Sequence, residues 1–321
     1  MVNRRKLYTG LWGTLFILAL TSIFIGSMEL SLPQLIQLDQ VAWMLLVTSR
    51  LPRLVSVVIT GVGLSVAGLL MQQLSQNRFV SPSTAATQDS ARLGILVSMI
   101  FFSSSTMYVR VGFAFMFALL GTGLFITAIE KIRIKNMIFV PLLGMTLGMV
   151  IDSLTTFLAL RFDVMQALSA YMVGNFSLLI RGRYELLYLA IIVVGLGYVF
   201  SHRFSVASMG EAVAVNLGLN YRQTIQLGLL IVSLISAVIV VTVGSIAYVG
   251  LIVPNIISMT FGDNLKRTLP TTALVGANFL LLADILSRVV IYPYQVPVGL
   301  IVGVVGSLLF IVILVQKRKL A

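Results

Sequence analysis

The sequence predicts an all-α polytopic membrane protein, with about ten transmembrane helices in a single domain over residues 1–321. Composition is the first reason, because 59% of the residues are hydrophobic and only 10% are charged, whereas about 25% of the residues of a soluble domain are charged. The second reason is the length of the apolar runs. Many have about 20 residues, as a helix that crosses a bilayer requires, whereas a transmembrane β-strand needs only about 10.

The first span is expected at residues 7–27, directly after the basic stretch NRRK at residues 3–6. Secretory signal peptides also begin with basic residues, but this apolar run is longer than their usual core and no A-x-A cleavage site follows it. We therefore expect an uncleaved span with the N-terminus in the cytoplasm. Residues 28–50 then form an external, partly interfacial segment.

Further apolar runs complete the predicted topology, at residues 51–74, 84–103, 108–129, 137–160, 184–201, 224–243, 248–261, 270–290 and 297–315. Residues 161–183 are short for a span and are expected outside, as a re-entrant or surface helix. Ten spans place both termini in the cytoplasm. On this map Lys and Arg are more numerous on inner than on outer segments, as the positive-inside rule requires. Topology therefore explains the net charge of +12, and no nucleic-acid partner is expected.

Small residues recur within several predicted spans, where they would let neighbouring helices approach closely. Gly144 and Gly148 form a G-x-x-x-G pair in the fifth span. The pattern predicts helix packing at Gly61, Gly68, Gly144, Gly148, Gly299 and Gly303.

A short helix with polar ends is expected at residues 207–220, ASMGEAVAVNLGLN, between two long apolar runs. Ser208 and Glu211 have the S-x-x-E spacing of a capping box, and Gly218 suits the left-handed residue that closes a helix. One interpretation is an interfacial helix that only joins two spans. The other is a rigid lever on the membrane surface that another protein can push.

The motif S-x-G-E-A-x-x-x-x-L-G in this helix resembles the coupling segment of the permease subunits of bacterial importers for iron-siderophores, haem and vitamin B12. Four more motifs of that family occur in the chain: RLPR at Arg50–Arg53, GSIAYVGLIVPN at Gly244–Asn255, LADILSR at Leu282–Arg288 and VPVG at Val296–Gly299. The resemblance extends from about residue 47 to the C-terminus. The stretch FVSPSTAATQDSARLG looks most like the siderophore branch, with haem and corrinoid import as alternatives.

The resemblance implies the membrane subunit of an ATP-driven importer in the bacterial cytoplasmic membrane, which is a transport component and not an enzyme. It would pair with a second permease, identical or related, with two ATP-binding subunits and with an extracytoplasmic substrate-binding protein. The chain has no G-x-x-x-x-G-K-[ST] phosphate loop, so ATP is expected on the partner subunits, and no cofactor or metal site is expected in this chain. The cytoplasmic coupling segment, about residues 203–222, would contact the ATPase through Ser208, Met209, Gly210, Glu211 and Ala212.

Two acidic residues, Asp152 and Asp284, lie within predicted spans, where a charge is costly and usually faces the bundle interior or water. They are compatible with a proton relay, which makes an ion-coupled secondary transporter the alternative function. For Asp284, inside the family's L-A-D-x-x-x-R motif, we favour a hydrogen-bonded, structural role within the bundle.

Three arginines are expected at the outer membrane surface, against the positive-inside rule. Arg50 and Arg53 flank Leu51-Pro52 at the mouth of the second span, and Arg288 lies at the outer end of the ninth. The resemblance implies that these arginines dock the substrate-binding protein by meeting its acidic residues, because guanidinium presents a fixed fork of donors to a carboxylate. The alternative is that the three side chains reach lipid headgroups.

Two residues depart from the family pattern. Asn255 follows Pro254 where many relatives have histidine, and Gln295 stands where many have glutamate. Both departures remove a titratable group, so residue roles near the eighth and tenth spans are not carried over.

Overall fold

The computed structural model describes residues 4–26, 32–37, 39–102, 106–132, 139–177, 179–262 and 264–320, and these residues form a helical bundle without β-strands. In chain order the helices are α1 (Arg4–Phe24), α2 (Leu32–Ile36), α3 (Gln40–Leu45), the π-helical turn η1 (Leu46–Arg50), α4 (Leu51–Leu74), α5 (Thr87–Phe101), α6 (Met107–Ile132), α7 (Phe139–Arg161), α8 (Met165–Met172), α9 (Leu187–Val199), α10 (Ser201–Ala207), α11 (Glu211–Asn216), α12 (Tyr221–Val243), α13 (Val249–Phe261), α14 (Leu265–Val289) and α15 (Val298–Leu320).

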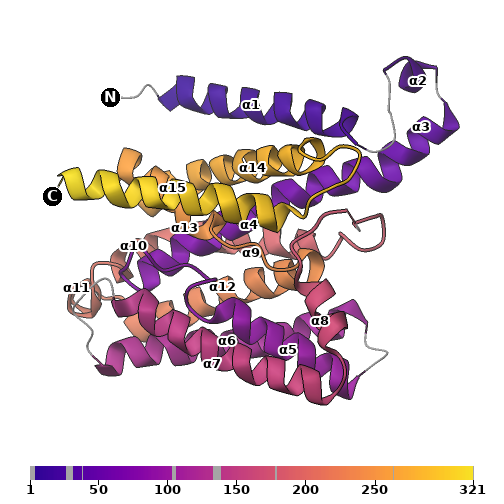
Figure 1. Ribbon diagram of the computed structural model, residues 1–321. Helices are drawn as coiled ribbons and strands as arrows, with labels where there is room; N and C mark the ends of the chain where they lie inside the picture. The colour runs from indigo at the N-terminus through magenta and orange to yellow at the C-terminus, as the bar shows by residue number, and fades with distance from the viewer. Residues whose placement is uncertain are drawn as a thin grey trace.

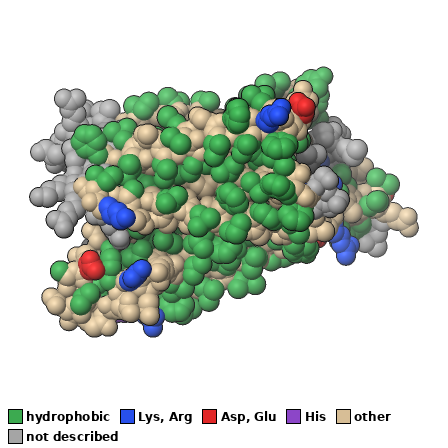
Figure 2. Space-filling view, turned by 90° about the horizontal axis from the view of Figure 1, so that it is seen from below, with side chains coloured by type: hydrophobic (Ala, Val, Ile, Leu, Met, Phe, Trp, Pro, Cys, Tyr) green, Lys and Arg blue, Asp and Glu red, His purple; other side chains and the backbone are tan. Residues whose placement is uncertain are grey.

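The two ends of the bundle differ in what they carry. Helices α10 and α11 lie at one end, together with the start of α1 and the end of α15, whereas α2, α3 and α8 lie at the other (Figure 1). The face in Figure 2 shows hydrophobic side chains over the middle and charged ones near the two ends, as expected for a protein that crosses a membrane. After the topology predicted from the sequence, we call the end with α10 and α11 the inner end and the opposite one the outer end.

Helix burial follows from position in the bundle. Helices α4 and α12 are central, because 78% of the most apolar stretch of each span is buried. In α1 only 6% of that stretch is buried, and in α7 only 22%. Among the described residues, six helices are long and apolar enough to cross a membrane, or seven if α9 and α10, bent by 60°, count as one span. Each predicted span coincides with a helix. Because α5, α13 and α15 are not among the helices that are long and apolar enough to cross a membrane, the count of ten spans stays a prediction.

The segment at residues 161–183 does not cross the bundle. It contains the short helix α8 and then an extended stretch that enters the core, where Asn175 N–H donates to the Val243 carbonyl (3.0 Å) and Gly174 accepts from Gly299 N–H (3.0 Å). Its far end returns to η1, because Arg181 N–H donates to the Thr48 carbonyl (3.2 Å). The expectation that these residues form no span is confirmed, and they lie at the outer end.

The small residues pack helices together at most of the predicted positions. A methyl group at Gly61 would lie 2.5 Å from the Gly276 carbonyl oxygen, and one at Gly68 would overlap Gly250, so these glycines let α4 touch α14 and α13. Gly144 and Gly148 do the same for α7, against Thr84 and Asp89 respectively, and Gly299 lies in ordinary contact with Ser245 and Gly174. Gly303 is different, because a methyl group built at this position would meet no atom within 4 Å. The prediction that Gly303 packs against another helix of this chain is therefore wrong.

Candidate functional site

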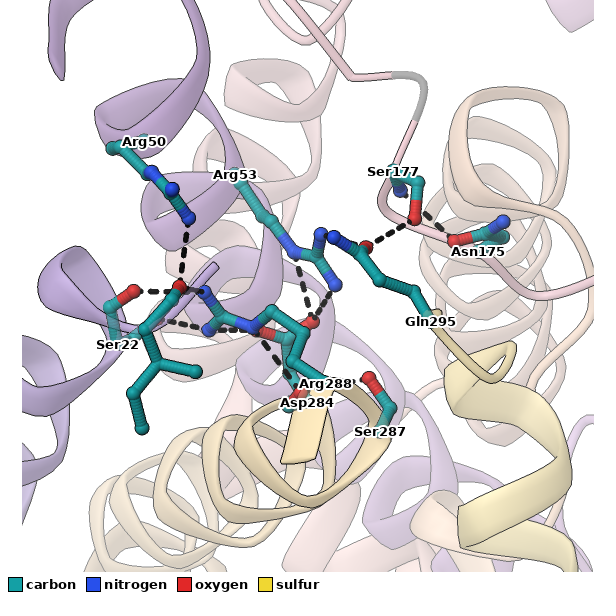
Figure 3. Close-up of polar contacts among 10 residues, drawn as sticks. Ser22, Arg50, Arg53, Asn175, Ser177, Asp284, Ser287, Arg288 and Gln295 are labelled. Atoms are coloured by element: carbon teal, nitrogen blue, oxygen red, sulfur yellow. Dashed lines mark hydrogen bonds and ion pairs between the residues drawn. The ribbon is translucent and has the colours of Figure 1, made fainter. Parts of the chain in front are cut away.

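A buried carboxylate organises the outer end. Asp284, in α14, has no solvent exposure and accepts hydrogen bonds at Oδ1 from Arg53 of α4, through Nε (3.0 Å) and Nη2 (2.8 Å). Its other oxygen, Oδ2, accepts from Nη2 of Arg288, one helical turn later (Figure 3). Both carboxylate oxygens are therefore used, and one negative charge compensates two positive ones.

Local sequence explains why these groups meet. Asp284 and Arg288 are four residues apart on one helix, so they share a face. Arg53 follows Pro52 in the first turn of α4, and the close approach at Gly61 holds that helix against α14. A buried charge costs several kcal/mol unless it is paired and hydrogen-bonded, and this arrangement supplies the partners.

The remaining donors of this cluster tie α1 to the bundle. Arg288 Nη1 donates to the carbonyl oxygens of Ser22 (2.8 Å) and Ile25 (2.7 Å), near the end of α1. Arg50 Nη1 donates to the same Ile25 carbonyl (2.7 Å), as Figure 3 shows. Because α1 buries little apolar surface, these bonds and its packing on α14 fix its outer end.

Gln295 connects the cluster to the segment that follows α8. Its Oε1 accepts from Arg53 Nη1 (2.7 Å) and from the Ser177 hydroxyl (2.8 Å). Ser177 is itself held by its N–H, which donates to Asn175 Oδ1 (2.9 Å). An amide oxygen accepts these bonds without adding charge. Gln295, which departs from the family pattern, therefore belongs to the hydrogen-bond network of this cluster.

The predicted exposure of the outer arginines is wrong. Arg50, Arg53 and Arg288 are only 8%, 7% and 2% exposed, because each side chain points into the bundle and bonds with groups of this chain. Contact of these arginines with lipid headgroups or with the carboxylates of a binding protein stays a prediction. The exposed cations in this part of the outer end are Arg181 and Arg183, which the sequence motifs did not single out.

The second intramembrane acid is also paired. Asp152 of α7 accepts from Nη1 of Arg92 of α5, and the two side chains are 42% and 20% exposed. The expectation that Asp284 is hydrogen-bonded within the bundle is confirmed, and Asp152 is hydrogen-bonded there as well.

At the inner end, α10 and α11 form a compact projection. Helix α10 is anchored by Phe204 and Ala207, which are 1% and 2% exposed. After α11, Gly218 N–H donates to the Val215 carbonyl (2.9 Å) and Leu219 N–H to that of Ala214 (2.9 Å), with Gly218 at φ +78°. This is a Schellman closure, so the expected role of Gly218 is confirmed.

The predicted capping box is wrong. Ser208 still belongs to the turn that ends α10, where its N–H donates to the Phe204 carbonyl (2.9 Å), and its hydroxyl donates back to the Ser205 carbonyl (2.9 Å). Helix α11 instead begins after Gly210, whose φ of +101° is a conformation that favours glycine. The glycine of the motif thus makes the turn between the two short helices.

The projection exposes apolar side chains at the inner end of the bundle, where the surroundings of a membrane protein are aqueous. Met209 is 63% exposed, Val215 54% and Leu217 65%, while Glu211 and Ala212 are also exposed beside them. Hollows of about 930 and 860 Å³ lie against this segment, one lined in part by His202 and Leu217 and the other by Glu211 and α6. Exposed apolar groups beside polar ones are typical of a protein-binding surface. No cluster of His, Cys, Asp or Glu that suits a metal ion occurs among the described residues.

Comparisons with known proteins identify relatives along nearly the whole chain. The model of the FecCD transport family matches residues 14–316. The petrobactin import system permease YclN of Bacillus subtilis is 48% identical, over 96% of this chain and 97% of that protein. The ferric-anguibactin transport permease FatD of Vibrio anguillarum is 40% identical, over 95% and 97%. A solved metal-chelate type ABC transporter, in an inward-facing conformation, has a TM-score of 0.83 at 25% identity and covers 97% of this chain and 99% of its own.

We predict that Asp284→Asn destabilises the protein strongly, because it leaves two buried guanidinium groups without a counter-charge. Removing one partner of a buried ion pair costs about 3–5 kcal/mol of unfolding free energy. The matched control is Asp163→Asn, an exposed aspartate at the same end, which should change stability by less than about 0.5 kcal/mol. Thermal unfolding of the purified variants in detergent measures both, and equal midpoints would show that the Asp284 cluster is not a structural node.

Proposed function

The chain belongs to the FecCD transport family, and from that premise we propose that it is the permease subunit of an ATP-driven importer that carries ferric siderophores across the bacterial cytoplasmic membrane. The observation that carries this proposal is similarity along nearly the full length to permeases named for petrobactin and anguibactin. The chain is a transport component and not an enzyme.

The inner projection is proposed to receive the force of ATP hydrolysis. Met209, Gly210, Glu211 and Ala212 occupy the turn and the first residues of α11, on a segment that α10 anchors in the bundle. A partner that pushes this rigid turn moves α9 and α12 directly, because the projection joins them. Two ATP-binding subunits would dock on a pair of permeases, identical or related, one of them at this projection, and those subunits would bind the ATP.

The binding protein is proposed to dock at the outer end. Arg181 and Arg183 offer exposed positive charge there, close to η1, and an acidic protein surface is their natural complement. Arg50, Arg53 and Arg288 would support the same surface from beneath by holding α1, α4 and the stretch after α8 in place.

The ion-coupled alternative is less well supported. Both acids that motivated it, Asp152 and Asp284, are bonded to arginines. Haem or corrinoid import is also less favoured, because the similar permeases at 40% identity or more are named for siderophores.

We predict that the purified protein in vesicles accumulates ferric siderophore only when its permease partner, ATPase and binding protein are present with ATP. A non-hydrolysable ATP analogue is the control and should give no accumulation. A proton or sodium gradient imposed on the permease alone should also give none. Accumulation driven by the gradient would establish the secondary-transporter function instead.

We predict that Glu211→Arg weakens ATPase docking and ATPase stimulation without unfolding the permease, because it reverses a charge on the exposed turn. Ser208→Ala should leave α11 folded, since the Ser208 hydroxyl bonds to the Ser205 carbonyl and does not cap α11. Glu185→Arg makes the same charge change at the outer end and serves as the control. Normal stimulation in the Glu211→Arg complex would place the ATPase contact elsewhere.

We predict that Arg181→Glu and Arg183→Glu each weaken binding-protein affinity, and more strongly at low salt, where exposed charges are less screened. Lys131→Glu, an exposed cation at the inner end, is the control and should leave the affinity unchanged. The measurement uses nanodiscs of neutral lipid, so that headgroup charge does not contribute. Salt-independent, wild-type affinity in both arginine variants would exclude this docking surface.

A further inference from the structure

A small basic recess lies at the inner end, where α1 and α14 begin and α9 and α13 end. Its volume is about 270 Å³, and its lining includes Tyr8, Tyr198, Lys266 and Arg267. Among the described residues, the lining contains two cations and no acidic side chain. Neither the coupling segment nor the outer cluster uses this recess.

Positive charge converges on the recess from several sources. Lys266 and Arg267 are exposed in the first turn of α14, where the helix dipole adds partial positive charge. The side chain of Asn264, the residue before the helix, makes no capping bond. Lys6 is exposed on α1, directly before a lining residue. The site therefore suits an anion.

The walls of the recess suit a lipid. Tyr8 bonds through its hydroxyl to Thr271 Oγ1 (2.8 Å), which places a tyrosine between α1 and α14, and Tyr198 is 43% exposed opposite apolar lining groups. Tyrosine is enriched at the level of the headgroups in membrane proteins. From the recess toward the outer end, α1 is almost uncovered by the rest of the chain, since only 6% of its most apolar stretch is buried. An acyl chain can therefore lie along α1.

We propose that this recess binds the headgroup phosphate of an anionic phospholipid of the inner leaflet, which bridges α1 and α14. Basic pockets between transmembrane helices on the cytoplasmic side bind such headgroups, because Lys and Arg pair with the phosphate while the acyl chains stay in the bilayer. The lipid complements the protein's own contacts: arginines hold α1 at the outer end, and the headgroup holds it at the inner end. The proposal does not depend on the transported substrate.

The test measures lipid binding to the purified full-length protein in detergent by native mass spectrometry. Phosphatidylglycerol and phosphatidylcholine with the same acyl chains are titrated against wild type, Lys266→Gln, Arg267→Gln and the double variant. Lys131→Gln removes an exposed cation at the same end but outside the recess, and is the matched control.

We expect wild type and Lys131→Gln to prefer phosphatidylglycerol, and each substitution in the recess to weaken its binding roughly fivefold. Excess inorganic phosphate should not displace the lipid, because the acyl chains contribute to binding. Equal phosphatidylglycerol affinity in the double variant and Lys131→Gln would overturn the proposal, as would a wild type without headgroup preference. Full displacement by phosphate would also overturn it and indicate a site for a free anion.

Discussion

One buried carboxylate, Asp284, constrains the outer half of this protein. It has no exposure to solvent and bonds two guanidinium groups, from Arg53 and Arg288, that would otherwise be isolated charges inside a membrane protein. The unused donors of those arginines find the α1 carbonyls and Gln295, so one ionic cluster fixes α1, α4, α14 and the stretch after α8 relative to one another. Glycine contacts along α4 continue the same helix alignment toward the inner end.

The inner end has the opposite character. Its projection is held by backbone bonds and a few buried side chains, and it presents apolar groups outward. The outer cluster is therefore buried and ionic, whereas the inner turn is exposed. The basic recess beside α1 adds a third element, in which we propose that a lipid headgroup supplements the contact between α1 and α14.

Much of the fold was predictable from the sequence, because apolar runs of membrane length mark helices wherever they occur. Gly61, Gly68, Gly144 and Gly148 were predictable as packing positions for a similar reason, since small residues inside such runs have few other uses. Gly303 was not, because a one-dimensional pattern does not show which face of α15 meets the rest of the chain.

The functional residues were harder to predict, because their roles depend on partners distant in sequence. The sequence predicts Arg53 and Arg288 as exposed charges near helix ends. Only the packing of α4 against α14 shows that both are buried and donate to Asp284. Ser208 and Glu211 have capping-box spacing, but the turn at Gly210 starts the helix too late for the serine to reach it. The amide at Gln295 had no visible partner in the sequence and proved to be a link in the cluster.

We propose that the α10–α11 projection contacts the ATP-binding subunit of the importer. The chain contains no cysteine, so a single introduced thiol reports its own position. In the assembled importer, Met209→Cys should cross-link to the ATP-binding subunit, and Arg181→Cys, at the outer end, should not. Cross-linking of the ATP-binding subunit to residue 181, or its failure at residue 209 in an active complex, would exclude the projection as the ATPase contact.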